Sequence, residues 1–252
     1  MTAVVPAGAV TNGALDGDGH PYVGLMVAKD DGGDPLWRCT GTLLSETLFL
    51  TAGHCTEAPA VTAEIWFDAD VTNAAAHGYP FDGDVSGTTY THPQYDPNAF
   101  FLFDLGVVVL DEPVVMATYG ALPTLNQLDS MKPGKRSTFT SVGYGLQRSF
   151  PDAASWKDQA LRIRMVAHPH LLQINTPGFT GDYSLLLSNN ARTGGTCFGD
   201  SGGPNFIGDS NVVAGVTSFG INPTCGGTGG VYRIDRADDL NWLYGTFGRY
   251  LP

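Results

Sequence analysis

The chain has 252 residues, of which only 15% are charged, with a formal net charge of −12 and 33 glycines. This length allows a sizeable core in one large or two small domains, and the chain has no run of 18 apolar residues to span a membrane. The negative charge argues against nucleic acid and anionic membranes as partners, because clustered Lys and Arg bind phosphate surfaces. Few charges and many turn-forming residues favour an all-β fold.

The beginning of the chain predicts an irregular arm over residues 1–19. The segment from Asp16 to Gly19 is a turn signal, with a calcium loop as the alternative. The first ten residues lack a basic start and are too short for a signal peptide. We therefore expect that a signal was removed or that the chain begins in a pro-segment.

Strand-forming segments follow the arm, and no helical period of useful length interrupts them as far as residue 110. The predicted strands of this first half cover residues 22–28, 38–44, 48–52, 61–67 and 105–110. Residues 111–135 contain three prolines and predict a linker between two halves.

The second half predicts further strands and then a helix. The strands cover residues 137–142, 160–167, 184–188, 211–219 and 229–234. Residues 236–247 carry Leu240, Leu243, Tyr244 and Phe247 at helical spacing, with Asp235 as the expected cap. The expected divisions are an arm or pro-segment remnant at 1–19, two β-barrels at 20–120 and 121–235, and a C-terminal helix and tail at 236–252.

The four cysteines lie at Cys39, Cys55, Cys197 and Cys225, with no C-x-x-C pair. A zinc site is therefore not expected. The even number fits two disulfides in a secreted protein, with pairing by proximity as the first hypothesis.

Ser201 lies among glycines, with Gly199 before it and Gly202 and Gly203 after it. Glycines at these positions allow a tight loop that turns backbone N–H groups toward one point. An acyl-transfer enzyme needs such a loop beside a nucleophilic oxygen, whereas a glycine-rich surface turn is the simpler interpretation.

A serine nucleophile needs a base and an acid that orients the base. His54 follows a predicted strand end and precedes Cys55, so a disulfide there would hold its backbone in place. Asp104 stands directly before a buried apolar run, where a carboxylate needs a partner such as an imidazole N–H. A half-buried structural histidine and a turn carboxylate are the alternative interpretations.

Three segments resemble the signature stretches of chymotrypsin-like (trypsin-fold) serine proteases, and they contain His54, Asp104 and Ser201. These segments are Thr51-Ala52-Gly53-His54-Cys55, Asp104-Leu105-Gly106-Val107-Val108 and Gly199-Asp200-Ser201-Gly202-Gly203-Pro204. They follow the family's chain order at separations of 50 and 97 residues. Residues 39–44, 92–95, 143–145 and 230–232 also resemble family segments, so the likeness extends from about residue 20 to the end.

The resemblance implies two six-stranded antiparallel β-barrels with the active site between them, and a C-terminal α-helix. It implies a catalytic triad of His54, Asp104 and Ser201, and an oxyanion hole formed by the N–H groups of Gly199 and Ser201. The implied disulfides are Cys39–Cys55 and Cys197–Cys225. The implied protein is a secreted, extracellular serine endopeptidase, monomeric and without cofactor or metal, with polypeptide substrates and protein protease inhibitors as partners.

The specificity pocket is also implied by the resemblance. Gly195, followed by Thr196, corresponds to its floor, and Gly220 and Gly230 correspond to its walls. Ser218-Phe219-Gly220 resembles the segment that pairs with the substrate backbone. An open, uncharged pocket implies a bulky apolar or aromatic residue before the scissile bond. Thr217 replaces the histidine of glutamate-specific relatives, while a carboxylate from another loop would restore Arg/Lys preference.

The chain departs from the family pattern at several points, and two of the family's frequent disulfides are absent. Gly53 replaces the usual alanine, Phe219 replaces the usual tryptophan, and no Ile-Val-Gly-Gly occurs. Family zymogens are activated when a new amino terminus pairs with the aspartate before the serine, here Asp200, and cleavage before Val10 or Ala9 is the corresponding hypothesis. A non-catalytic protease homologue that acts as a binding module and a hydrolase of esters or small acyl substrates are the alternative functions.

Overall fold

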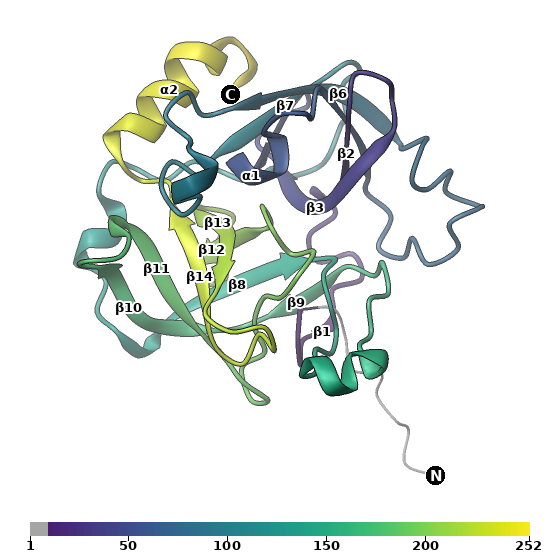
Figure 1. Cartoon of the computed structure of the whole chain (residues 1–252). Coiled ribbons are helices and arrows are strands. Elements are labelled where there is room, and N and C mark those ends of the chain that lie inside the picture. Colours follow the sequence, from purple (N-terminus) through teal and green to yellow (C-terminus); the bar gives the residue numbers. More distant parts are fainter. Residues whose placement is uncertain (1–9) are drawn as a thin grey trace.

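The structure is a computed structural model that describes residues 10–252, apart from the side chain of Trp156 (Figure 1). The first nine residues of the predicted arm, including Ala9, lie outside the described residues. Two groups of strands lie one above the other in Figure 1, with a helix along one side.

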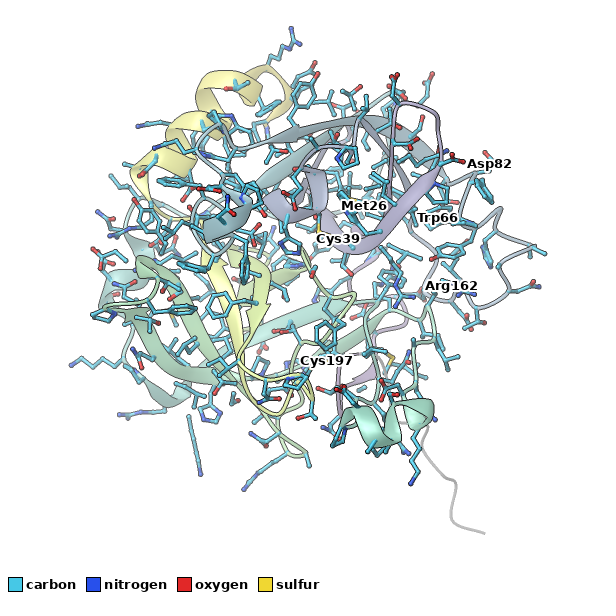
Figure 2. The ribbon with its side chains drawn as sticks, in the orientation of Figure 1. Met26, Cys39, Trp66, Asp82, Arg162 and Cys197 are labelled. Carbon is cyan, nitrogen blue, oxygen red and sulfur yellow. A yellow bond between two sulfur atoms is a disulfide. The ribbon has the colours of Figure 1, made fainter. Side chains whose placement is uncertain are left out.

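The first barrel is a closed ring of six antiparallel strands in the order β2-β3-β4-β7-β6-β5. Its strands are β2 (Val23–Lys29), β3 (Pro35–Leu43), β4 (Leu48–Thr51), β5 (Thr62–Trp66), β6 (Val85–Thr91) and β7 (Gly106–Leu110). Val23, Leu50 and Val107 are fully buried in the core of this half. Met26 and Trp66 are labelled on the same half in Figure 2.

The second barrel closes because β8 pairs with both β10 and β12. Its strands are β8 (Gly134–Gly143), β10 (His170–Thr176), β11 (Gly181–Asn189), β12 (Pro204–Ile207), β13 (Val213–Gly220) and β14 (Gly227–Arg233). Short strands β9 (Met165–Ala167) and β1 (Ala14–Leu15) extend this sheet from β8. Phe139, Leu171 and Leu185 are fully buried within it. The predicted fold of two six-stranded barrels is confirmed.

Some predicted strand limits are wrong. β1, β6, β10 and β12 were not predicted, and the segment 160–167 forms a strand only over its last three residues. Upstream of β9, Gln147 Nε2 donates to the Leu161 carbonyl at 2.7 Å, and Gln147 Oε1 accepts from the Leu161 N–H at 2.7 Å. The backbone groups of this segment are thus partly satisfied by a side chain, where a strand ladder would otherwise be needed.

The C-terminal helix α2 (Ala237–Phe247) is confirmed, but two of its predicted details are wrong. Asp235 does not cap it, because buried Arg233 and the Leu128 N–H hold that carboxylate. Tyr244 is 55% exposed, while the other predicted face residues are buried. The remaining helices are α1 (Gly53–Thr56) and the 3-10 turns Pro97–Ala99, Gln127–Ser130, Asp152–Lys157 and Gly248–Tyr250. Among residues 10–252, no helix has the length and apolar character needed to cross a membrane.

Buried Arg164 joins the two barrels to the N-terminal segment. Its Nε donates to Asp16 Oδ2 at 2.9 Å, and its Nη1 and Nη2 donate to the carbonyls of Phe67 and Gly17. His20 Nδ1 lies 2.6 Å from the other oxygen of Asp16. The predicted turn at Asp16 is therefore held by the side chains of Arg164 and His20, which occupy the carboxylate that the calcium-loop alternative requires. Arg162 also bridges the barrels by donating to the carbonyls of Val71 and Thr72 (Figure 2).

Candidate active site

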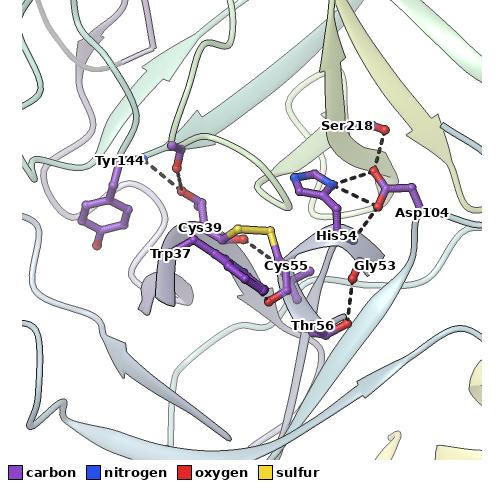
Figure 3. Close-up of a disulfide and its surroundings, with 12 residues drawn as sticks. Trp37, Cys39, Gly53, His54, Cys55, Thr56, Asp104, Tyr144 and Ser218 are labelled. Carbon is purple, nitrogen blue, oxygen red and sulfur yellow. Dashed lines mark hydrogen bonds and ion pairs between the residues drawn. A yellow bond between two sulfur atoms is a disulfide. The ribbon is translucent and has the colours of Figure 1, made fainter. Parts of the chain in front are cut away.

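His54 lies on the single turn of α1, directly after β4. The next residue, Cys55, is bonded to Cys39 on β3, and one imidazole nitrogen lies within 4.8 Å of both sulfurs (Figure 3). The structure contains this predicted disulfide and the second one, Cys197–Cys225. The bridge and the helical turn together fix the backbone of His54 at the end of the barrel. Since both of these sulfurs are bonded to each other, the cluster Cys39, His54 and Cys55 offers no thiolate to a metal.

Asp104 is fully buried and receives hydrogen bonds from two residues. Its Oδ1 accepts from the His54 backbone N–H at 2.9 Å, and His54 Nδ1 lies 3.0 Å from both carboxylate oxygens. The Ser218 hydroxyl donates to Oδ2 at 2.5 Å (Figure 3). Because a carboxylate only accepts, Nδ1 carries the proton that faces it, which leaves Nε2 as the basic nitrogen.

Burial of the imidazole by itself lowers the pKa of His54, but the Asp104 and Glu57 carboxylates outweigh it and raise this pKa above its ordinary value. Glu57 directly follows α1, three residues after His54. On a helical turn this spacing places two side chains on one face. The sequence interpretation did not single out Glu57.

Backbone contacts to both barrels hold the Ser201 loop in place. The Thr40 N–H donates to the Ser201 carbonyl at 2.8 Å, and the Gly202 N–H donates to the Thr217 carbonyl at 2.8 Å. Gly202 has a φ of +77°, and a Cβ there would collide with the hydroxyl of Thr51, at the end of β4. Glycine is therefore required for Ser201 to approach the strand end that carries His54. Within residues 10–252, the Ser201 hydroxyl donates no hydrogen bond.

The loop before Ser201 leaves two backbone donors free. Among the described residues, no acceptor is recorded for the N–H groups of Gly199 and Ser201, while the Gly199 carbonyl accepts from Thr40 Oγ1 at 2.9 Å. Gly199 has a φ of +93°, which favours glycine. Free N–H groups that flank a nucleophile are what an oxyanion-binding loop requires.

Asp200 lies beneath this loop and is fully buried. It accepts from the N–H groups of Cys197 at 2.8 Å and Gly145 at 2.7 Å. Burial raises the pKa of Asp200 to about 7, against the opposing effect of these hydrogen bonds and of the Arg38 guanidinium. A Cβ at Gly143 or Gly145 would collide with the Asp200 carboxylate, which explains the glycines of the Gly-Tyr-Gly turn.

The N-terminal segment packs against the predicted pocket floor. Val10 is fully buried beside Met165 and Ala167. The Gly195 N–H donates to the Thr11 carbonyl at 3.1 Å, and Thr11 Oγ1 donates to the Gly195 carbonyl at 3.0 Å. The start of the described chain thus lies in the same region as the loop that carries Asp200.

A cavity of about 290 Å³ opens beside Ser201. Ser201, Thr196, Ser218, Phe219 and Gly220 line it, as the predicted site requires. The other lining residues are Phe100, Cys197, Phe198, Thr217 and Cys225, so within the described part of the chain no charged side chain lines the cavity. Phe100 and Phe198 were not singled out from the sequence.

Gly195 and Gly230 do not line this cavity. A Cβ at Gly230 would collide with the Phe219 ring, and one at Gly195 would collide with the Asn189 side chain. Asn189 also donates to the Thr196 carbonyl at 2.8 Å. The two glycines therefore act indirectly. Gly230 lets the ring of Phe219, which lines the cavity, pack closely, and Gly195 does the same for the Asn189 side chain.

A row of aromatic rings leads away from the cavity. The ring centroids of Phe219 and Phe179 are 5.7 Å apart, and those of Phe179 and Phe101 are 4.6 Å apart. Phe101 contacts Phe100 at 5.6 Å. Phe100 and Phe179 of this row, and Phe198 of the cavity lining, are each at least 40% exposed, so an apolar surface lies beside the cavity.

The family model described as Trypsin matches residues 16–242. The chain is 28% identical over 205 residues to brachyurin of Leptuca pugilator, which covers 76% of this chain and 80% of that protein. It is 28% identical over 221 residues to trypsin of Saccharopolyspora erythraea, which covers 84% of this chain and 87% of that protein.

Solved structures share the fold. HL collagenase matches with a TM-score of 0.71 at 21% identity, over 94% of this chain and 98% of that chain. Human heparin binding protein matches with a TM-score of 0.69 at 21% identity, over 96% of this chain and 98% of that chain. At this identity the likeness shows the fold alone, so the chemistry has to be argued from the residues of the site.

Proposed function

The chain belongs to the trypsin family of serine endopeptidases, and we propose that it hydrolyses peptide bonds through Ser201, His54 and Asp104. The observation that carries this proposal is the pairing of a buried Asp104 carboxylate with His54 Nδ1 at 3.0 Å. That pairing leaves Nε2 available as the base for the hydroxyl of Ser201.

In the proposed reaction, Ser201 Oγ attacks the substrate carbonyl carbon while His54 Nε2 takes the hydroxyl proton. The C–N bond then breaks, and His54 returns the proton to the leaving amine. Water then attacks the acyl-enzyme carbonyl while His54 takes its proton. The ester C–O bond breaks, His54 returns the proton to Ser201 Oγ, and the acid is released. Asp104 keeps the imidazole in the required tautomer and stabilises the imidazolium that forms in each step.

The N–H groups of Gly199 and Ser201 would bind the oxyanion of both tetrahedral intermediates. Their lack of an acceptor in the described chain supports this role, because a preorganised donor pays no reorganisation energy during the reaction. One donor of this type contributes about 2.7–4 kcal/mol to transition-state stabilisation in other enzymes.

We propose that the cavity takes a bulky apolar or aromatic residue that precedes the scissile bond. Its uncharged lining and its volume of about 290 Å³ support this preference. The row from Phe219 to Phe100 would contact apolar residues further upstream in the substrate. Gly195, Thr196 and Gly230 would shape the floor and wall of the pocket, and Ser218-Phe219-Gly220 would pair with the substrate backbone.

We also propose that the protein is secreted, that it is a monomer, and that protein protease inhibitors bind it.

We propose further that cleavage before Val10 activates the protein. The new amine would pair with Asp200, whose buried carboxyl accepts hydrogen bonds from the backbone N–H groups of Cys197 and Gly145. Ala9, the alternative start, lies outside the described residues. N-terminal sequencing of the active protein tests this step, and activity with a native start far from residue 10 would contradict it.

Cleavage of a peptide library tests the proposed activity and its preference together. We expect cleavage after Phe, Tyr, Leu or Met, and its loss in Ser201→Ala. Cleavage after Lys or Arg would contradict the preference proposed from the uncharged lining of the cavity. A binding module without hydrolytic activity would leave the library intact in both proteins.

A further inference from the structure

Arg38 differs from the other basic residues that are not exposed. Lys29, Arg162, Arg164, Arg233 and Arg236 each donate to oxygen atoms of the protein. Arg38 is half-buried, yet no hydrogen bond or ion pair of its guanidinium is recorded among residues 10–252. A guanidinium has five N–H donors, and a partly desolvated one without partners is suited to bind an anion.

The guanidinium lies against the proposed oxyanion loop. A Cβ at Gly199 would be 3.0 Å from Arg38 Nη2 and 3.3 Å from its Nε, with the Gly145 Cα also at 3.0 Å. The guanidinium therefore covers one side of the glycine whose N–H faces the reacting carbonyl in the proposed mechanism.

The position of Arg38 indicates which side of the scissile bond its guanidinium would contact. Arg38 does not line the cavity, which would hold the acyl side of the scissile bond. It precedes Cys39, whose disulfide partner Cys55 follows His54, the residue that returns the proton to the leaving amine. The guanidinium thus contacts the Gly199 loop from outside the cavity, and the disulfide ties the strand of Arg38 to the turn that carries His54.

The nearby carboxyl of Asp200 does not satisfy Arg38. Its carboxylate accepts from the N–H groups of Cys197 and Gly145, and it forms no ion pair with the guanidinium. Arg38 is thus left to interact with a group that the protein itself does not supply.

We propose that Arg38 selects an acidic side chain on the leaving-group side of the scissile bond. This inference rests on the proposed peptidase activity. A carboxylate matches the planar guanidinium in a two-point hydrogen bond, and partial burial strengthens the attraction. The protein's net charge of −12 repels acidic peptides elsewhere, so the preference depends on this local cation.

The test uses two quenched-fluorescence peptides with the same acyl side, which carry Glu or Gln at the two positions after the scissile bond. We expect the wild-type protein to favour the Glu peptide in kcat/KM by about 10-fold at low salt, and less at 1 M salt. Arg38→Gln should reduce this ratio to about 1, and Arg38→Lys to an intermediate value, because lysine keeps the charge without the planar fork. The matched control is Arg136→Gln, at an exposed arginine, which should keep the wild-type Glu-to-Gln ratio.

An equal Glu-to-Gln ratio in wild type and Arg38→Gln would overturn the inference. A parallel loss of kcat/KM on both peptides would also overturn it, because it would mean that Arg38 supports the oxyanion loop. If Arg38→Gln does not fold, the salt dependence of the wild-type ratio decides, and a ratio of 1 at low salt overturns the inference. Failure of the wild-type protein to cleave either peptide would instead overturn the proposed function itself.

Discussion

The hydroxyl of Ser218 donates a 2.5 Å hydrogen bond to Oδ2 of Asp104, which joins the second barrel to the carboxylate of the first. Ser218 lies on β13, and Asp104 precedes β7. His54 uses the same carboxylate, so the orientation of the imidazole depends on both barrels. A residue assigned from the sequence only to substrate pairing therefore also orients the proposed acid of the triad.

Ser218→Ala removes this hydrogen bond and leaves Asp104 with His54 as its partner. A hydrogen bond to a charged group contributes about 1.5–3 kcal/mol, so we expect kcat/KM to fall by roughly 10-fold or more. Steady-state hydrolysis of an aromatic peptide measures the effect. Ser210→Ala, at an exposed serine, is the control, and an equal rate in both variants would contradict the role of Ser218.

Glu57→Gln should shift the pH dependence of catalysis. Burial opposes the charged imidazole, while Asp104 and Glu57 raise the pKa of His54 above its ordinary value. The base acts in its neutral form, so activity appears as pH rises through this raised pKa. Removal of the Glu57 charge should move the acidic limb of kcat/KM to lower pH. An NMR titration of His54 provides the same readout without activity, and an unmoved midpoint would contradict the prediction.

The buried carboxyl of Asp239 should make the free energy of unfolding depend on pH. Burial raises the pKa of this fully buried carboxyl to about 8, and Tyr232 is its hydrogen-bond partner. Between about pH 4 and pH 8 the unfolded chain has released this proton and the folded chain retains it, so the free energy of unfolding falls as pH rises and levels off above about pH 8. Asp239→Asn should flatten this slope in urea unfolding measured at several pH values. Asp200 adds a slope of the same sign, so the variant retains part of it, and an undiminished slope would contradict the role of Asp239.

Gly220→Val tests the size of the pocket. The nearest atom to a Cβ at Gly220 would be the Asn222 carbonyl oxygen at 3.6 Å, so the substitution fits the fold. The two methyl groups would project beside a cavity of about 290 Å³ and reduce its capacity. We expect kcat/KM for a Phe peptide to fall by about 10-fold or more relative to an Ala peptide. An unchanged Phe-to-Ala ratio would place the specificity pocket elsewhere.

The sequence predicted the features that depend on contiguous residues. His54, Asp104 and Ser201 each lie in a short segment whose residue types have a local reason, such as the glycines that shape the Ser201 loop. The apolar run of β7 and the spacing of α2 are also local signals, and both elements are present. The strand β6, which is rich in threonine and half exposed, carries no comparable pattern.

Long-range contacts were not predictable in the same way. The bond from Ser218 to Asp104 joins residues 114 positions apart, and Asp235 binds the Leu128 N–H from 107 positions away. Phe100 reaches the cavity from a loop of the first barrel, and no residue pattern indicates that position. Such contacts depend on how the two barrels and their loops pack together, and a local pattern does not encode that packing.

Labelling with a fluorophosphonate, followed by mass spectrometry of the digested protein, tests the proposed nucleophile most directly. The reagent phosphonylates a serine hydroxyl that an adjacent base activates. We expect a single adduct on Ser201, strongly reduced labelling in His54→Ala and no labelling in Ser201→Ala. A folded, activated protein that remains unlabelled, or an adduct on another residue that persists in Ser201→Ala, would contradict the proposed triad.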